Sequence, residues 1–198
     1  MKTIQYYFSP KSPWTYLGHE RLIGLARQHG ALIEPKPADL ARIFPLSGGL
    51  PLNKRPPQRQ AYRLTELKRW SHYLDLPLNV QPRFFPVDET DAAKMIASVI
   101  KAGDSDGALK LSGAVLRAVW AEERDIADTA TLIQIANDCG LDGAALHAGR
   151  EAGAGLYEQY TNEAIELQVF GAPWYVYRGE SFWGQDRLEF LERALAAD

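Results

Sequence analysis

The chain has 198 residues, of which 46% are hydrophobic and 24% are charged, which is ordinary for a globular protein of one domain, with or without a large insertion. Its net charge of −3 argues against general nucleic-acid binding, because proteins of that class usually carry a basic excess. A single cysteine excludes a disulfide framework and a cysteine-rich zinc site, and the lack of a membrane-length apolar run or a signal-peptide core predicts a cytoplasmic protein.

The N-terminal residues predict a strand, a helix and a second strand. Residues 4–8 form a short apolar and aromatic run, which is typical of a strand. A helix is expected from Pro13 to about His29, because Ser12 is a good N-cap, Pro13 suits the first helical position and Gly30 suits the C-cap. A second strand is expected over residues 31–36, weakened at its end by prolines.

The remainder predicts a long helical block followed by two strands and a helix. Residues 38 to about 168 are expected to be almost wholly helical, with Cys139 on the apolar face of one helix and therefore buried. Strands are expected at 174–177 and about 181–183, and a last helix at 185–196 with three leucines facing inward: Leu188, Leu191 and Leu195.

This order of elements, β-α-β, helices, then β-β-α, predicts an α/β protein with a thioredoxin-like fold that carries a large all-helical insertion. The predicted thioredoxin-like domain comprises residues 1–40 and 168–198. The predicted helical insertion domain comprises residues 41–167.

The first candidate functional motif is Ser12-Pro13-Trp14-Thr15, at the predicted start of the first helix. It has the shape of a C-x-x-C redox motif with both sulfurs replaced by hydroxyls, so it cannot form a disulfide. Any thiol chemistry here must use a sulfur that arrives with a ligand. Free N–H groups and the helix dipole favour an anion at this place, and a hydroxyl can donate a hydrogen bond to a thiolate. Ser-Pro is also an ordinary helix cap, and the motif alone leaves both interpretations open.

Two further motifs fit a ligand at the same place. Pro173 opens a predicted strand, where thioredoxin-like folds place a cis-proline that exposes the preceding backbone to an extended ligand. A trans-proline is the open alternative. Gly184 allows a ligand close to the backbone before the last helix, and Gln185 and Asp186 can together bind the ammonium and carboxylate of an amino-acid head. Simple helix capping also explains an Asp at that position.

A basic segment, residues 53–70, indicates a site for carboxylates in an otherwise acidic chain. It holds six basic side chains against Glu66: Lys54, Arg55, Arg59, Arg63, Lys68 and Arg69. The first three lie in or beside a proline-rich loop and are the better candidates, because a solvated helix face explains the last three equally well. The four histidines show no metal-ligand spacing, so no metal site is expected.

Together these segments resemble the 2-hydroxychromene-2-carboxylate isomerase family, which is related to kappa-class glutathione transferases and DsbA-like proteins. The resemblance covers essentially the whole chain. Five segments carry it: Ser-Pro-Trp-Thr-Tyr-Leu-Gly at 12–18, Asn53-Lys54, Arg69-Trp70, Val-Phe-Gly-Ala-Pro at 169–173 and Trp-Gly-Gln-Asp-Arg-Leu at 183–188.

The resemblance implies glutathione as cofactor and assigns roles to named residues. Ser12 would be catalytic and contact the glutathione sulfur, Ala172 and Pro173 would pair with the glutathione backbone, and four residues would bind its γ-glutamyl end: Trp183, Gly184, Gln185 and Asp186. Asn53 would lie in the active-site loop. Lys54 and Arg59 would meet a carboxylate of the substrate or of glutathione. Phe84 would line the substrate pocket, where a tyrosine is expected in the family, and Lys11 adds a positive charge beside the expected thiolate.

The function implied by the resemblance is glutathione-dependent cis–trans isomerisation. The enzyme would interconvert 2-hydroxychromene-2-carboxylate and trans-o-hydroxybenzylidenepyruvate by thiolate addition, bond rotation and thiolate expulsion, with glutathione regenerated. The partner would be a small aromatic carboxylate, and the chain would form a homodimer. The alternatives are a kappa-like transferase or peroxidase that consumes glutathione, and a non-catalytic thioredoxin-like binding module.

Overall fold

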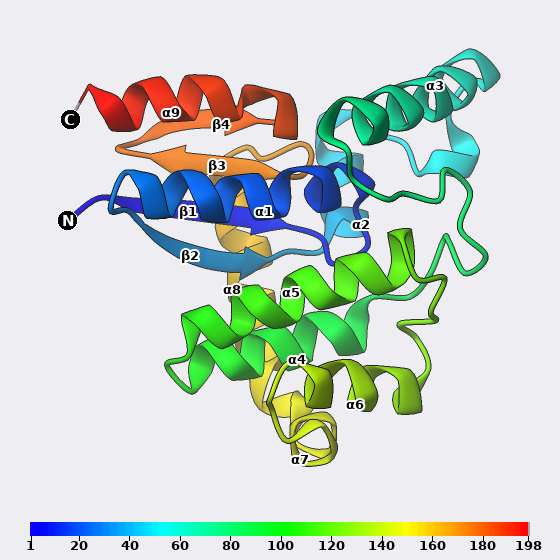
Figure 1. Cartoon of the computed structure of the whole chain (residues 1–198), viewed down its shortest axis with the longest axis vertical. Helices are drawn as coiled ribbons and strands as arrows, with labels where there is room; N and C mark the ends of the chain where they lie inside the picture. Colours follow the sequence, from blue (N-terminus) through cyan, green and yellow to red (C-terminus); the bar gives the residue numbers. More distant parts are fainter. Residues whose placement is uncertain (198) are drawn as a thin grey trace.

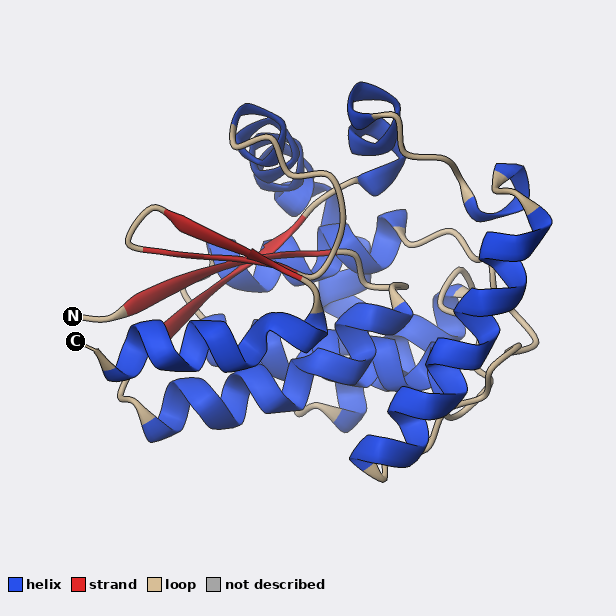
Figure 2. Cartoon of the chain, turned by 90° about the horizontal axis from the view of Figure 1, so that it is seen from above, coloured by secondary structure: helices blue, strands red, loops and turns tan. Residues whose placement is uncertain are grey.

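A computed structural model describes residues 1–197, and its centre is a four-stranded sheet in the order β2-β1-β3-β4. The strands are β1 (Thr3–Phe8), β2 (Leu32–Pro37), β3 (Trp174–Tyr177) and β4 (Glu180–Trp183). β1 pairs with β2 in parallel and with β3 antiparallel, and β3 pairs with β4 antiparallel. Helices cover both faces of the sheet (Figures 1 and 2).

The helices follow the predicted order. They are α1 (Pro13–Gln28), α2 (Leu40–Ile43), α3 (Pro57–Leu74), α4 (Thr90–Lys101), α5 (Ser105–Trp120), α6 (Thr129–Asp138), α7 (Gly143–Ala148), α8 (Ala154–Glu166) and α9 (Leu188–Ala196). Short 3₁₀ turns lie at Phe44–Ser47, Leu52–Lys54, Arg150–Gly153 and Gln185–Arg187. The sequence therefore predicted the thioredoxin-like arrangement correctly, and the helical segment between β2 and β3 is confirmed.

The central strand β1 is buried on both faces, which explains its nearly continuous apolar sequence. Tyr6 stacks on Phe8 and on Tyr175, with ring centroids 4.6 and 5.6 Å apart, in the main core beneath α1 and α9. Tyr7 points to the opposite face and joins a smaller cluster with Trp174 and with Ala164 of α8.

The boundaries of the elements agree closely with the sequence. α1 ends at Gln28, and Gly30 adopts φ +61°, as a C-cap glycine does. Cys139 is buried. The last helix starts as a 3₁₀ turn and becomes α-helical at Leu188, and its three predicted inward leucines are buried. β2 extends to Pro37, one residue beyond the prediction, because it is an edge strand that pairs only with β1 among the described strands.

One expectation within the helical block is wrong. Residues 75–89, between α3 and α4, form no helix, although almost all of this block was expected to be helical. Pro77, Pro82 and Pro86 interrupt the segment, and each removes a backbone donor that a helix needs.

The division into two domains stays a prediction. α8 lies inside the predicted insertion, yet its Ala164 is buried in one cluster with Tyr7 and Trp174 of the sheet. The second face of the thioredoxin-like sheet is thus covered by a helix from the insertion.

His19 joins α1 to α5 through a fully buried imidazole. Its Nε2 lies 3.0 Å from the carbonyl oxygen of Leu109, so Nε2 must carry the proton and donate it. Nδ1 then accepts from the Tyr6 hydroxyl, 3.2 Å away. Burial lowers the pKa of His19, opposed by nearby Glu20 and by the hydrogen bond to Leu109.

The lowered pKa of His19 predicts a loss of stability in mild acid. The unfolded chain takes up a proton on His19 as the pH falls below about 6.5, whereas the folded protein resists it. The free energy of unfolding should therefore fall from that pH downward, by at most about 1.4 kcal/mol per pH unit from this residue. Urea unfolding between pH 7.5 and 5.5 measures it. H19Q should show a smaller slope than the wild type, H72Q, at an exposed position of α3, should keep the wild-type slope, and equal slopes in all three would contradict the assignment.

Candidate active site

The pairing of β1 with β3 brings the Ser12 motif and Pro173 to the same edge of the sheet. Tyr7 pairs with Trp174, so the chain leaves β1 where it enters β3. After Phe8 a tight turn, closed by the hydrogen bond from Ser12 N to Ser9 O (3.0 Å), leads into α1. The Ala172–Pro173 peptide bond is cis, as thioredoxin-like folds require at this place, and the open alternative of a trans bond is removed.

Ser12 caps α1 and keeps its hydroxyl proton available. Its side-chain oxygen accepts a hydrogen bond from Thr15 N at 3.2 Å, and its carbonyl accepts from Tyr16 N at 3.0 Å. Within residues 1–197 the Ser12 hydroxyl donates to no acceptor, so its O–H group can donate to a ligand. The Thr15 hydroxyl is buried and has no hydrogen-bond partner within residues 1–197, so it contributes nothing visible to this cap.

The turn after β4 is fastened to Pro173. Gly184 N donates to Pro173 O at 2.9 Å, and Gly184 adopts φ +100°, which side chains strongly disfavour. Trp183 is 51% exposed and packs so closely on Gly171 that a Cβ there would lie 2.6 Å from its Nε1. The β3–β4 hairpin thus brings residues 171–173 next to residues 183–184.

Gly18 allows the same turn to lie directly on α1. A Cβ at Gly18 would meet the Gln185 Cβ at 2.8 Å and the Tyr175 hydroxyl at 3.0 Å. Arg21 donates to the backbone oxygen and to Oε1 of Gln185, at 3.0 and 2.7 Å. Gln185 is therefore buried with its side-chain carbonyl already engaged.

Asp186 lies in a different environment from its neighbour Gln185. Its side chain is 41% exposed and forms an ion pair with Arg187 at 2.7 Å. Of the two polar side chains predicted to bind an amino-acid head, Asp186 is the accessible one.

The basic segment divides into exposed and half-buried members. The side chains of Asn53, Lys54 and Arg59 are exposed and form no hydrogen bond or ion pair with another residue of the described chain. Phe84 is half-buried, with the Arg83 guanidinium 5.1 Å from its ring centroid. Figure 1 places α3 on the side of the molecule toward which the N-terminal end of α1 points.

The structure decides between the two interpretations that the sequence left open for Arg63. The sequence left open whether Arg63 belongs to a solvated helix face or to a carboxylate site, but Arg63 is half-buried and its guanidinium lies over the rings of Phe85 and Trp120, so the solvated face is excluded for this residue. The residues it contacts come from the proline-interrupted loop and from the end of α5, which no local pattern on α3 could indicate.

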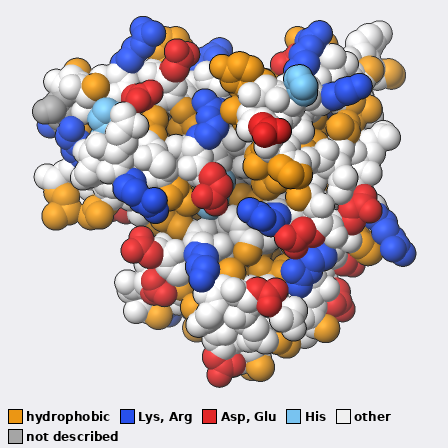
Figure 3. All heavy atoms as spheres, viewed as in Figure 1, with side chains coloured by type: hydrophobic (Ala, Val, Ile, Leu, Met, Phe, Trp, Pro, Cys, Tyr) orange, Lys and Arg blue, Asp and Glu red, His pale blue; other side chains and the backbone are white. Residues whose placement is uncertain are grey.

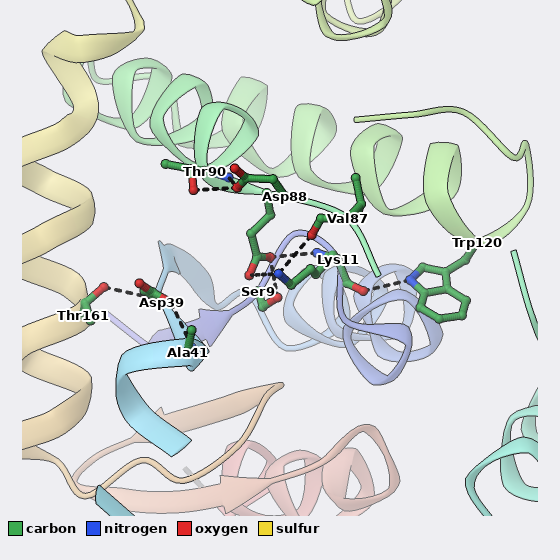
Figure 4. A network of polar contacts seen from close by, with 10 residues as sticks. Ser9, Lys11, Asp39, Ala41, Val87, Asp88, Thr90, Trp120 and Thr161 are labelled. Carbon is green, nitrogen blue, oxygen red and sulfur yellow. Dashed lines mark hydrogen bonds and ion pairs between the residues drawn. The ribbon is translucent and has the colours of Figure 1, made fainter. Parts of the chain in front are cut away.

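Sequence reasoning missed a buried carboxylate beneath the Ser12 turn, at Glu89. This side chain accepts hydrogen bonds from the Ser9 hydroxyl and from Lys11 N (3.0 Å), and Lys11 Nζ lies 3.5 Å from it. Lys11 Nζ also donates to Val87 O at 3.0 Å (Figure 4). Lys11 is therefore directed into this network. Burial raises the pKa of Glu89, opposed by Lys11 and the Ser9 hydrogen bond.

The described chain has neither a cluster of metal-ligating side chains nor a helix of membrane-spanning character. Within residues 1–197, no three His, Cys, Asp or Glu side chains gather closely enough to hold a metal ion. Every helix in the same range is too short or too polar to cross a membrane.

Comparisons with known proteins agree with this geometry. The family model of the DsbA-like thioredoxin domain matches residues 3–196. A 2-hydroxychromene-2-carboxylate isomerase of Sphingobium xenophagum is 33% identical over 197 residues, which is 98% of each chain. The chain belongs to the DsbA-like thioredoxin family, among the 2-hydroxychromene-2-carboxylate isomerases.

More distant comparisons within this family place the isomerases nearer than the transferases. A solved structure of a 2-hydroxychromene-2-carboxylate isomerase superposes with a TM-score of 0.83 at 28% identity, covering 98% of this chain and 95% of the other. A glutathione S-transferase kappa 1 of Caenorhabditis elegans is 24% identical and covers 95% of this chain and 88% of its own.

The network around Glu89 predicts that the Ser12 turn depends on this carboxylate. Replacing Glu89 by Gln leaves one acceptor for three donors, so E89Q should lower the free energy of unfolding by about 1–3 kcal/mol. Urea unfolding at pH 7 measures it. The matched control is E151Q. It removes the surface ion pair between Lys94 and the Glu151 side chain, which is 64% exposed, and it should change the free energy of unfolding little. Equal effects in both variants would contradict the role assigned to Glu89.

Proposed function

We propose that this protein is a glutathione-dependent isomerase that interconverts 2-hydroxychromene-2-carboxylate and trans-o-hydroxybenzylidenepyruvate during the breakdown of aromatic compounds. Full-length similarity to proteins named for that isomerase supports the reaction. Similarity to kappa-class glutathione transferases supports the cofactor. The observation that carries the proposal is the free hydroxyl donor of Ser12 at the N-terminus of α1, beside the cis-bond of Pro173.

The residues at this edge of the sheet fit a glutathione molecule. The dipole and free N–H groups of α1 favour an anion at Ser12. The cis peptide bond between Ala172 and Pro173 would make the backbone N–H and C=O groups of Ala172 available to pair with an extended peptide. Gly184 has no side chain to block approach, Trp183 offers an exposed indole, and Asp186 offers an accessible carboxylate for an ammonium group. The Gln185 side chain is held by Arg21 and would support the positions of Gly184 and Asp186 on either side of it.

Bound glutathione would supply a thiolate that adds to a carbon–carbon double bond of the ring-opened substrate and leaves again, so that rotation occurs about the temporary single bond. Ser12 would hold that thiolate ionised by donating its hydroxyl proton in a hydrogen bond. The positive end of α1 would add to this stabilisation. The chain itself supplies no sulfur here, since Cys139 is buried and burial raises its pKa, with Lys110 opposing.

The substrate would lie between this edge and the basic segment. Lys54 and Arg59, exposed and without partners in the described chain, would attract its carboxylate, Asn53 would offer a neutral hydrogen bond, and Phe84 would contact its ring. A kappa-like transferase that consumes glutathione is the second candidate, because of the similarity to the kappa enzymes.

Two features of the setting are part of the proposal. The cytoplasm would supply reduced glutathione, since that pool keeps cytosolic thiols reduced. The family resemblance supports a homodimer as the working assembly.

Ser12→Ala tests the catalytic role. Losing one hydrogen bond to a charged sulfur should lower the rate of isomerisation by about 10- to 100-fold and raise the pKa of bound glutathione's thiol. The conversion of the chromene carboxylate can be followed by absorbance, and the thiolate by its own absorbance against pH. The matched control is D128A, which also removes a helix N-cap, that of α6, and should keep the wild-type rate.

The same assay separates the candidate functions. Isomerisation with all glutathione recovered supports the isomerase, and loss of glutathione to a conjugate supports the transferase. No turnover with either compound would leave a binding module. An unchanged rate in S12A would contradict the proposed role of the hydroxyl.

The assembly is tested by light scattering during size-exclusion chromatography. The expected result is twice the mass of one chain at micromolar concentration. A single-chain mass at every concentration used in the activity assay would overturn the homodimer.

A further inference from the structure

Arg63 is a half-buried cation without an anion. Its guanidinium carbon lies 5.3 Å from the ring centroid of Phe85 and 5.6 Å from that of Trp120. Within residues 1–197 it takes part in no ion pair or hydrogen bond with a carboxylate. The acidic side chain of α3, Glu66, is paired with Arg69 at 2.6 Å. An unpaired charge in such a place is costly unless a partner arrives.

The neighbouring charge increases this cost. Burial and, to a smaller extent, the nearby charge of Arg55 together lower the pKa of Arg63 to about 10. Arg55 is half-buried itself, and burial and Arg59 lower its pKa. The positive charge of Arg55 therefore acts on Arg63, and that of Arg59 acts on Arg55. Figure 3 shows Lys and Arg side chains next to hydrophobic ones over α3.

The aromatic contacts of Arg63 lead to the Ser12 turn. Phe85 and Trp120 pack together with ring centroids 4.8 Å apart, and Trp120 is fully buried. The Trp120 indole donates to the carbonyl of Lys11 at 3.1 Å, and Lys11 directly precedes Ser12 (Figure 4). A single buried side chain thus separates the guanidinium from the turn that begins α1.

The contacts with Phe85 and Trp120 restrict the movement of the Arg63 guanidinium. A guanidinium held against aromatic rings by cation–π contacts keeps its N–H groups as donors, and two of them can form parallel hydrogen bonds with one carboxylate. The exposed Lys54 and Arg59 lack such a support, and their flexible side chains can attract an anion without orienting it.

We propose that Arg63 binds the carboxylate of the aromatic substrate, with the Phe85–Trp120 pair holding its guanidinium in place beside the Ser12 turn. The inference rests on the proposed function for the identity of the substrate, and it makes Arg63, rather than Lys54 or Arg59, the residue that selects for a carboxylate. Lys54 and Arg59 then attract the anionic substrate as it approaches the site, and Arg63 binds its carboxylate.

The test uses R63Q and R63K in the full chain with saturating glutathione. R63Q should raise the KM for the chromene carboxylate at least tenfold while changing kcat much less, and R63K should lie between R63Q and the wild type, because it keeps the charge but loses the fork. R69Q, on the exposed side of the same helix, is the matched control and should keep the wild-type KM. Glutathione affinity, measured by calorimetry, should change less than twofold in all of them.

A binding measurement keeps the test independent of turnover. trans-Cinnamate and its uncharged amide serve as probes, and the wild type should prefer cinnamate by at least tenfold, a preference that R63Q should abolish. If R63Q fails to fold by circular dichroism, the wild-type preference and R63K decide.

Several results would overturn the assignment. They are an unchanged KM in R63Q, an equal affinity of the wild type for the two probes, or a loss of glutathione affinity that matches the loss of substrate affinity. If the wild type prefers cinnamate through Arg63 but does not turn over the chromene carboxylate, the proposed function fails and the carboxylate site stands.

Discussion

The site depends on the position of β1 between a parallel and an antiparallel neighbour. β1 pairs with β2 on one side and with β3 on the other, and the register of Tyr7 with Trp174 sets the end of one strand against the start of the other. Backbone hydrogen bonds of the sheet therefore determine the separation of the Ser12 turn from Pro173. The hydrogen bond from Gly184 to Pro173 extends the same constraint to the turn after β4. A shift of β3 by one residue would turn its side chains to the opposite faces of the sheet. It would also separate the Ser12 turn, Pro173 and the turn after β4 from one another.

Around this edge, the chain supports the turn from both sides. Below it, the buried Glu89 carboxylate accepts hydrogen bonds from the Ser9 hydroxyl and from Lys11 N. Beside it, Trp120 holds the carbonyl of Lys11. Glu89 directly precedes α4 and Trp120 ends α5, so the helical segment between β2 and β3 fixes the geometry of the thioredoxin-like motif as well as surrounding it. This support explains how a turn of four residues with no disulfide is held in one conformation.

The features that the sequence predicted well are those with local causes. The cap at Ser12, the inward leucines of α9 and the glycine after α1 follow from capping and periodicity within one element. Pro173 and the Trp183–Asp186 turn were recognisable because their order along the chain matches a known fold. Glu89 and Arg63 could not be assigned in that way. Glu89 resembles any acidic residue before a helix until the turn between β1 and α1 packs against it. Arg63 resembles any cation on a polar helix until the loop of residues 75–89 and the end of α5 pack against it. Their roles come from desolvation and from partners distant in the chain.

The replacement of both sulfurs by hydroxyls, together with the burial of Cys139, has a consequence for how such an enzyme ages. A thiol that belongs to the chain is lost for good when it is over-oxidised. Under the proposed function the vulnerable sulfur belongs to a small molecule that exchanges with the surrounding pool. Oxidative damage at the reacting atom would then be repaired by dissociation and replacement, with no reductase acting on the protein and no new chain to synthesise.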